Sequence, residues 1–125
     1  MADIAVGVPA FTINSADRYI IGNVSDAASG VIAIQGTSAA FAGTGIIVVG
    51  RVHGANAGAW VALPYVRRDL AGTGSDDTTV IAALTNSFLI RVEASGLDVA
   101  LDASAGGWSG GSMAVNVSRV EGGLR

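Results

Sequence analysis

The stretch from residue 87 to residue 104 reads SFLIRVEASGLDVALDAS, and it decides the fold class. Apolar side chains recur at every second position on both sides of the pair Ser95-Gly96. A period of two places one set of side chains on each face of a β-strand, and Ser-Gly is a turn signal. Two such runs joined by a short turn predict a β-hairpin. The apolar faces of the two runs are formed by Phe88, Ile90, Val92 and Ala94 and by Leu97, Val99, Leu101 and Ala103.

Short segments of the same kind recur along the chain between glycines. We expect further strands at residues 19–24, 31–35, 45–53, 59–65, 78–83 and 112–120. The segment 45–53 is apolar on both faces as far as Val49, which predicts a central strand that is covered on both sides. We expect it to form a hairpin with the segment 59–65. Residues 39–43 (AAFAG) are rich in alanine and also fit a short turn of helix.

This pattern predicts an all-β protein. About eight short strands with turn signals every ~8–12 residues are typical of a single antiparallel β-sandwich or a jelly roll, and not of βαβ units. The strand order stays open, because both folds produce the same pattern of short strands. A length of 125 residues fits one domain. We expect residues 19–125 to form the sandwich and residues 1–18 to form an extended N-terminal arm.

The N-terminal segment differs from the rest of the chain. Residues 2–12 (ADIAVGVPAFT) are mostly apolar, and Pro9 cannot donate a hydrogen bond within a central strand. We expect this arm to dock on a neighbouring molecule and to become ordered when bound. The residues expected to contact a partner are Ile4, Val6, Val8, Pro9, Phe11 and Trp108.

The charge content limits the possible partners. Charged residues make up only 14% of the chain, against about 25% in ordinary soluble domains. A surface with so few charges is partly neutral or apolar, and a protein partner, including a second copy, is its usual cover. The net charge is −3 and the seven basic residues are scattered arginines, so nucleic acid is not an expected partner.

The sequence also limits the compartment. The chain has no cysteine, which excludes disulfides and cysteine-based zinc sites. Its N-terminus has neither the basic region nor the long apolar region of a signal peptide. No segment approaches the ~20 apolar residues that span a bilayer. We therefore expect a soluble protein made in the cytoplasm, with no membrane partner.

Catalytic motifs are not recognisable in the sequence. His53 is the only histidine, so a Ser-His-Asp triad would have to use it, and the G-x-S-x-G elbow is missing. A histidine at a strand end that faces solvent or a neighbour is the expected role. Glu93 and Glu121 are the only glutamates, and a cross-strand ion pair is a commoner role for Glu93 than glycosidase chemistry. We expect no catalytic residue and no enzymatic activity.

Metal and cofactor sites are not expected either. Asp76, Asp77 and Thr78 could supply oxygen ligands to Ca²⁺, but the regular D-x-D-x-D-G spacing is missing. Asp98 and Asp102 share one strand face, which we interpret as a solvated face. The sequences GTG at 43–45 and 72–74 resemble fragments of phosphate loops, but neither continues into Lys-Ser/Thr or a helix, so they are interpreted as turns.

The two tryptophans have different surroundings. Trp60 lies in an alternating strand, so we expect it in the core, where an aromatic side chain buries ~150–250 Å². Trp108 lies in the glycine-rich stretch AGGWSGGS at 105–112. There it is either a plug over one end of the sandwich or an exposed contact residue, because tryptophan is enriched at interface hot spots.

Several elements taken in order resemble small β-sandwich modules of tailed-phage structural proteins. The resemblance covers most of the chain after residue 30. Its elements are IIVVGRVHG (46–54), WVALPY (60–65), LIRV (89–92), SGL (95–97), VALDAS (99–104) and GSMAVNVS (111–118).

Such modules occur as capsid decoration proteins and in tail, baseplate and fibre proteins. The resemblance therefore implies a virion protein made in the cytoplasm of a bacterial host. No catalytic residue carries over from these modules.

Three hypotheses follow. The first is a capsid decoration or cement protein that binds the phage major capsid protein, as a homo-oligomer for which the resemblance favours a trimer. The second is a tail, baseplate or fibre component that binds a host-surface glycan or a neighbouring tail protein. The third, a small hydrolase on a jelly-roll scaffold, is disfavoured by the single histidine and the absence of a clustered polar motif.

Overall fold

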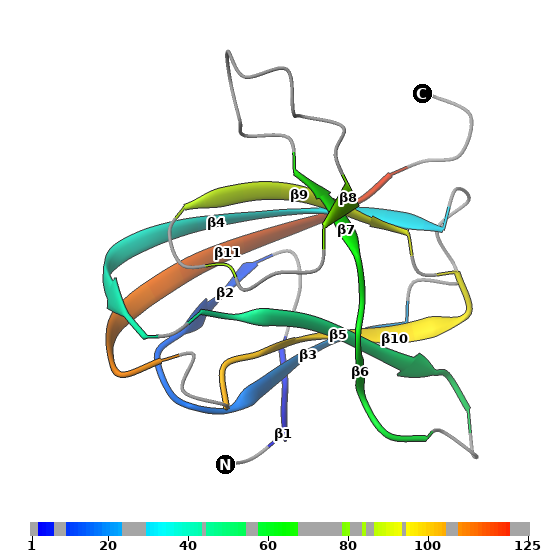
Figure 1. Ribbon diagram of the computed structural model, residues 1–125, viewed down its shortest axis with the longest axis horizontal. Helices are drawn as coiled ribbons and strands as arrows, with labels where there is room; N and C mark the ends of the chain where they lie inside the picture. The colour runs from blue at the N-terminus through cyan, green and yellow to red at the C-terminus, as the bar shows by residue number, and fades with distance from the viewer. Residues whose placement is uncertain are drawn as a thin grey trace.

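The structure of the protein is a computed structural model that describes residues 3–6, 10–23, 30–43, 45–54, 58–67, 79–80, 84, 87–93, 95–104 and 108–120. In these residues the chain is all-β, with eleven strands and no helix. Two mostly antiparallel sheets form two layers, compatible with a β-sandwich (Figure 1). The expectation of an all-β, two-layered fold is confirmed.

The five-stranded sheet has the order β1-β3-β10-β5-β6. Its strands are β1 (Asp3–Ala5), β3 (Arg18–Asn23), β10 (Leu97–Asp102), β5 (Ile47–Val52) and β6 (Val61–Ala62). All pairs are antiparallel except β1 with β3, which is parallel. β10 lies at the centre, so the outer face of this sheet is organised around it.

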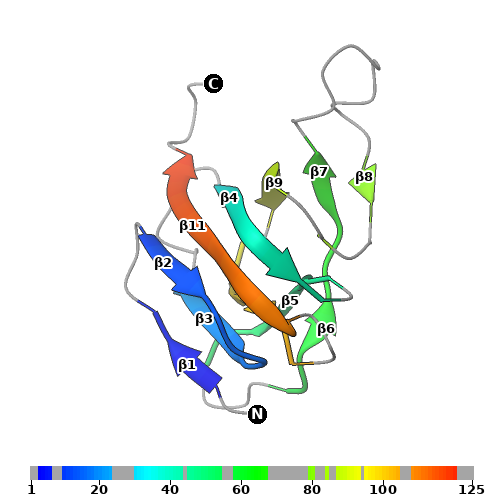
Figure 2. The same ribbon diagram turned by 90° about the vertical axis from the view of Figure 1, so that its left-hand side faces the viewer.

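The six-stranded sheet has the order β2-β11-β4-β9-β7-β8 and is entirely antiparallel. Figure 2 shows β2, β11 and β4 side by side. The six strands are β2 (Ala10–Ile13), β11 (Gly110–Val120), β4 (Val31–Ala42), β9 (Phe88–Glu93), β7 (Tyr65–Arg67) and β8 (Thr79–Val80). The long strands β4 and β11 form its centre.

The core lies between the sheets and is filled by the alternating apolar residues that the sequence predicts. Burial alternates strictly along β9. The odd-numbered residues of β10 face the core, as does every second residue of β11. The largest fully buried side chains are Tyr65, Ile13, Ile32, Ile34, Ile46, Leu84, Ile90, Leu101, Met113, Val48 and Val92. The period-two pattern therefore predicts the inward-facing positions of β9, β10 and β11 correctly.

The predicted hairpin of residues 87–104 is wrong. β9 pairs with β4 and β7 in one sheet, whereas β10 pairs with β3 and β5 in the other. The turn at Ser95-Gly96, where Gly96 has a φ of +77°, is therefore a corner between the sheets. The apolar faces of β9 and β10 still point into the same core, because the two sheets enclose it from opposite sides.

The segment predicted as one strand at 59–65 is divided between the sheets. β6 pairs with β5, as expected for the second hairpin, but β7 pairs with β8 and β9 across the core. Figure 1 shows β6 and β7 following one another from one layer to the other. Pro64 lies between them and has no N–H to continue a ladder, which favours the change of sheet.

Two further expectations need correction. Residues 39–42, which also fit a turn of helix, form the end of β4, where Ala40 adopts a φ of +56°.

The N-terminal segment, expected as an extended arm, instead supplies an edge strand to each sheet, β1 and β2. Ile4, Val6 and Phe11 pack against the core and Ile13 is fully buried within it. The apolar character of the described part of this segment is thus explained by packing within its own sandwich.

Candidate functional site

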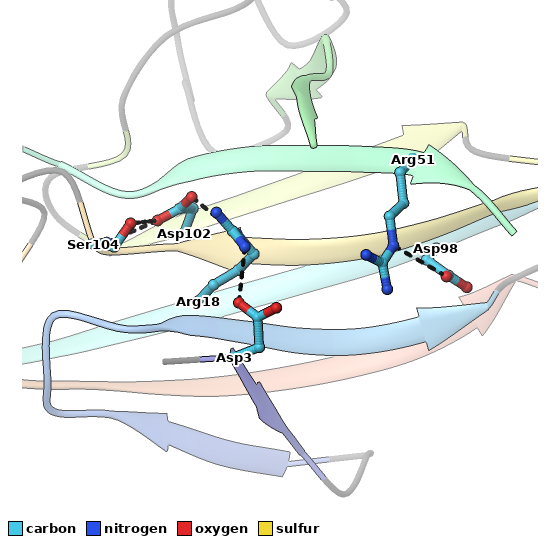
Figure 3. Close-up of polar contacts among 6 residues, drawn as sticks. All are labelled: Asp3, Arg18, Arg51, Asp98, Asp102 and Ser104. Carbon is cyan, nitrogen blue, oxygen red and sulfur yellow. Dashed lines mark hydrogen bonds and ion pairs between the residues drawn. The ribbon is translucent and has the colours of Figure 1, made fainter. Parts of the chain in front are cut away.

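The outer face of the five-stranded sheet carries a cluster of charged side chains. Asp98 and Asp102 point outward from β10, as the sequence pattern predicts. The strand register places Asp102 opposite Arg18 on β3 and Asp98 opposite Arg51 on β5. Figure 3 shows these two groups side by side on the sheet.

Arg18 links three strands. Its Nη1 lies 2.8 Å from Asp3 Oδ1 on β1, and its Nε lies 3.2 Å from Asp102 Oδ2 on β10 (Figure 3). The Arg18 side chain is only 18% exposed and that of Asp102 15%, so this pair is better shielded from solvent than a surface ion pair. The arginine therefore fastens the parallel edge strand β1 to the sheet.

Asp102 is held in its charged form. Burial by itself raises the pKa of its carboxyl group. Hydrogen bonds from the hydroxyl and the backbone N–H of Ser104, together with Arg18, outweigh this effect and lower the pKa below its ordinary value of 3.8. Asp102 is therefore charged at neutral pH, where it holds Arg18.

The second group consists of Arg51, Asp98 and His53. Asp98 Oδ1 lies 2.7 Å from His53 Nδ1, and Asp98 Oδ2 lies 3.6 Å from Arg51 Nε (Figure 3 shows the arginine and the aspartate). The Arg51 Nε atom is buried and has no hydrogen-bond partner among the described residues. His53 therefore faces a neighbouring carboxylate at a strand end, in agreement with its expected role.

Trp60 lies against both arginines. The guanidinium carbon of Arg51 is 4.3 Å from its ring centroid and that of Arg18 is 5.5 Å away, which are cation–π distances. Trp60 is only partly buried and is not part of the core, so the expectation of a core tryptophan is wrong. On the same outer face, Ala100 (0% exposed) and Val49 (6%) are buried although they lie outside the core cluster. Both faces of β5 are thus covered as far as Val49, as the sequence predicts.

The contact residues proposed from the sequence are not brought together into one exposed patch. Ile4, Val6 and Phe11 are partly buried against the core, and the ring of Phe11 stacks on Tyr19 with centroids 6.0 Å apart. Val8 and Pro9 lie outside the described residues.

Trp108 is also half-buried against the core, and its Nε1 donates a hydrogen bond of 2.9 Å to the Gly111 carbonyl oxygen. Of its two alternative roles, this arrangement favours the plug.

Two further candidates from the sequence have partners close by. His53 is bound through Nδ1 to Asp98. Glu93, expected in a cross-strand ion pair, instead accepts hydrogen bonds from Ser95 in the following turn.

Within the part of the chain that the structure describes, no group of three or more His, Cys, Asp or Glu side chains could hold a metal ion. The possible Ca²⁺ ligands Asp76, Asp77 and Thr78 lie outside the described residues. So do the GTG sequence at 72–74 and Glu121.

The sequence did not predict a second candidate surface, the outer face of the six-stranded sheet. The outer face of the six-stranded sheet is lined by small neutral side chains, and a shallow groove of about 150 Å³ crosses it. The groove is lined by Ala33, Gln35, Leu89, Asn116, Val117 and Ser118. The sequence does show small or uncharged side chains at every second position of residues 33–37 and 114–118. Only the strand order shows that these two sets of side chains form one face.

No family model, curated protein or solved structure matches this chain. No helix in the described residues is long and apolar enough to cross a bilayer.

Proposed function

We propose that the protein is a non-enzymatic structural protein of a tailed-phage virion, a capsid decoration or cement protein that binds the shell in many copies. The charge distribution carries this proposal. The five-stranded sheet bears a self-paired cluster of charges on its outer face, whereas the outer face of the six-stranded sheet is nearly neutral. Neutral side chains cost less to desolvate than charged ones, so the neutral face is suited to being covered by protein.

The order of elements supports the same proposal. The segments that resemble phage modules lie on β5, β6, β9, β10 and β11, so they form the body of the sandwich. Successive strands repeatedly change sheet, which favours a jelly roll as the finer fold class. The edge strands β1 and β2 are the part of the N-terminal segment that a neighbouring subunit reaches.

The test is the position of the protein on the particle. Quantitative mass spectrometry of purified particles should give a copy number comparable to that of the major capsid protein, and a particle map should place the sandwich on the shell. A few copies per particle, located at the tail, would replace this proposal with the tail or baseplate alternative. Absence from purified particles would exclude both.

The tail or baseplate alternative is favoured by one observation. Trp60 lies half-exposed on a sheet face beside Arg51, Asp98 and His53. An aromatic ring flanked by polar groups can stack on a sugar while its neighbours bind hydroxyls. Titration of purified protein with host-surface polysaccharide, followed by tryptophan fluorescence, would test this role. Binding that is abolished by Trp60→Ala but kept by Trp108→Phe would support it.

A further inference from the structure

We infer that two copies of this chain pair through the outer faces of their six-stranded sheets. The inference goes beyond the proposed function, because it takes this face as the contact between two copies and leaves the contact with the shell to other surfaces. It does not depend on where in a virion the protein lies.

The first argument is the neutrality of this face. On β2, β11 and β4 the outward side chains are small or uncharged, and the described charges on the face, Arg91 and Glu93, lie at one end of β9. The neutral set consists of Ala10, Thr12, Ala114, Asn116, Ser118, Ala33, Gln35 and Thr37. A face without a net field is compatible with its own copy, because no like charges are brought together.

The second argument is the shape of the face. Leu89 on β9 is one of the exposed large apolar side chains, with 37% of its surface accessible. Gln35 on β4 lies between Leu89 on one side and Asn116 on the other. Leu89 and Asn116 thus lie at the two sides of the groove, and beside Asn116 the β11 side continues with the shorter side chain of Ser118.

A two-fold axis that runs along β4 makes these features complementary. Rotation about this axis exchanges the β9 side with the β11 side, so Leu89 of one copy faces Asn116 and the groove of the other. One row further along, Ala33 lies between Arg91 and Ser118, so Arg91 meets an uncharged hydroxyl of the second copy. The contact is isologous, and the two sheets pack face to face with their strands aligned. A two-fold pair differs from the trimer that the resemblance favours.

The size of the face sets the strength of pairing. With the axis along β4, the strands β11, β4 and β9 of one copy cover β9, β4 and β11 of the other. Three strands spaced ~4.8 Å apart, over about eight residues of ~3.4 Å each, give roughly 400 Å² per copy. Stable specific interfaces bury about 800 Å² per partner, so the pair should be weak and reversible. Repetition on a shell would strengthen it through multivalency.

Sedimentation over micromolar to millimolar concentrations tests the pairing. The unmodified chain should show a monomer–dimer equilibrium, and Leu89→Asp should raise its dissociation constant by about tenfold or more, because a charge would be buried without a partner. Val61→Asp is the matched control, since Val61 is 62% exposed on β6 of the other sheet and its substitution should leave the equilibrium unchanged. Far-UV circular dichroism should show that both variants are folded.

Crosslinking tests the geometry. Because the chain has no cysteine, Leu89→Cys and Asn116→Cys each introduce a single thiol. A short bis-maleimide should join the two variants when they are mixed, and should join neither variant efficiently to itself.

A strict monomer, a trimer, a Leu89→Asp variant that pairs normally, or crosslinks within one variant alone would overturn the inference. These outcomes leave the particle measurement untouched, so a failure of the pairing and a failure of the virion proposal can be told apart.

Discussion

Gly36 is a residue whose identity is determined by its neighbour across the sheet. It lies opposite Phe88, and a Cβ atom at this position would overlap the aromatic ring. The Phe88 ring therefore occupies the space of the missing side chain, and it is 2% exposed. A glycine inside a strand often marks such a close approach.

We predict that Gly36→Ala lowers the free energy of unfolding by about 1–3 kcal/mol, the usual cost of overpacking a core. Urea denaturation measures the effect. Gly58→Ala is the control, because nothing lies within 4 Å of a Cβ there, and it should change stability by less than about 0.5 kcal/mol. Equal midpoints for the two variants would show that the ring moves away without cost.

Asp102 gives the fold a pH dependence. Its pKa in the folded protein lies below the ordinary value of 3.8, so its contribution to stability is present above that pH and is lost as the pH falls through the folded-state pKa. Asp102→Asn should therefore lower the Tm at neutral pH, and as the pH falls below 3.8 its Tm should fall less steeply than that of the unmodified chain. The cost at neutral pH should be about 1–3 kcal/mol, since charged hydrogen bonds are lost.

Asp3→Asn serves as the matched control for this prediction. Asp3 shares the same arginine, but its side chain is 44% exposed, so its substitution should have a small effect on the Tm. A Tm profile of Asp102→Asn that runs parallel to that of the unmodified chain at all pH values would contradict the role assigned to Asp102.

At the scale of elements, the β4–β11 ribbon is bent by an irregularity in its register. The pairing shifts between Gly110 and Ser112, where Gly111 has a φ of +71° and Ala40 opposite has a φ of +56°. A Cβ on Gly111 would overlap the Ala40 carbonyl group. Bulges of this kind bend a strand and increase its twist, and β4 and β11 curve together at this end (Figure 1).

Gly111→Ala should destabilise the protein by about 2 kcal/mol or more, because the substitution combines a positive φ with a backbone clash. The adjacent Gly110→Ala is the control, since open space surrounds a Cβ at that position. Thermal unfolding of the two variants side by side measures the difference. If both variants melt together, the bulge has relaxed to accept a side chain.

At the scale of the whole molecule, the N-terminal strands complete both sheets. β1 is tied to the five-stranded sheet through Arg18, and β2 lies along β11 in the six-stranded sheet. The first thirteen residues thus contribute Ile4, Phe11 and Ile13 to the sandwich. This role differs from that of an arm that becomes ordered only on a partner.

Deletion of residues 2–12 separates the two roles. The structure predicts a loss of several kcal/mol, which is a large part of the stability of a small domain, so the truncated chain should be unfolded or melt far lower. Thr12→Ala on the outer face of β2 is the control and should retain the normal Tm. A truncated chain that is folded with an unchanged Tm would restore the arm.

The sequence by itself determined the all-β class and the direction of most side chains. Alternation along residues 88–93, 97–103 and 113–117 predicted which positions face the core, and it placed Asp98 and Asp102 on one outward face. It did not predict the burial of Ala100 on that outward face. These features are local, because the period of a strand depends only on its own backbone and on which side faces water.

Tertiary structure alone decided which strands pair. An alternating run presents the same pattern to any partner, so nothing in the segment around Ser95-Gly96 distinguishes a hairpin from a corner between sheets. The same limit applies to the surfaces. Arg18 and Arg51 flank the two aspartates, and Trp60 lies over both arginines, only because β3, β5 and β6 are brought beside β10. Such contacts depend on long-range packing of the whole chain, which no single segment encodes.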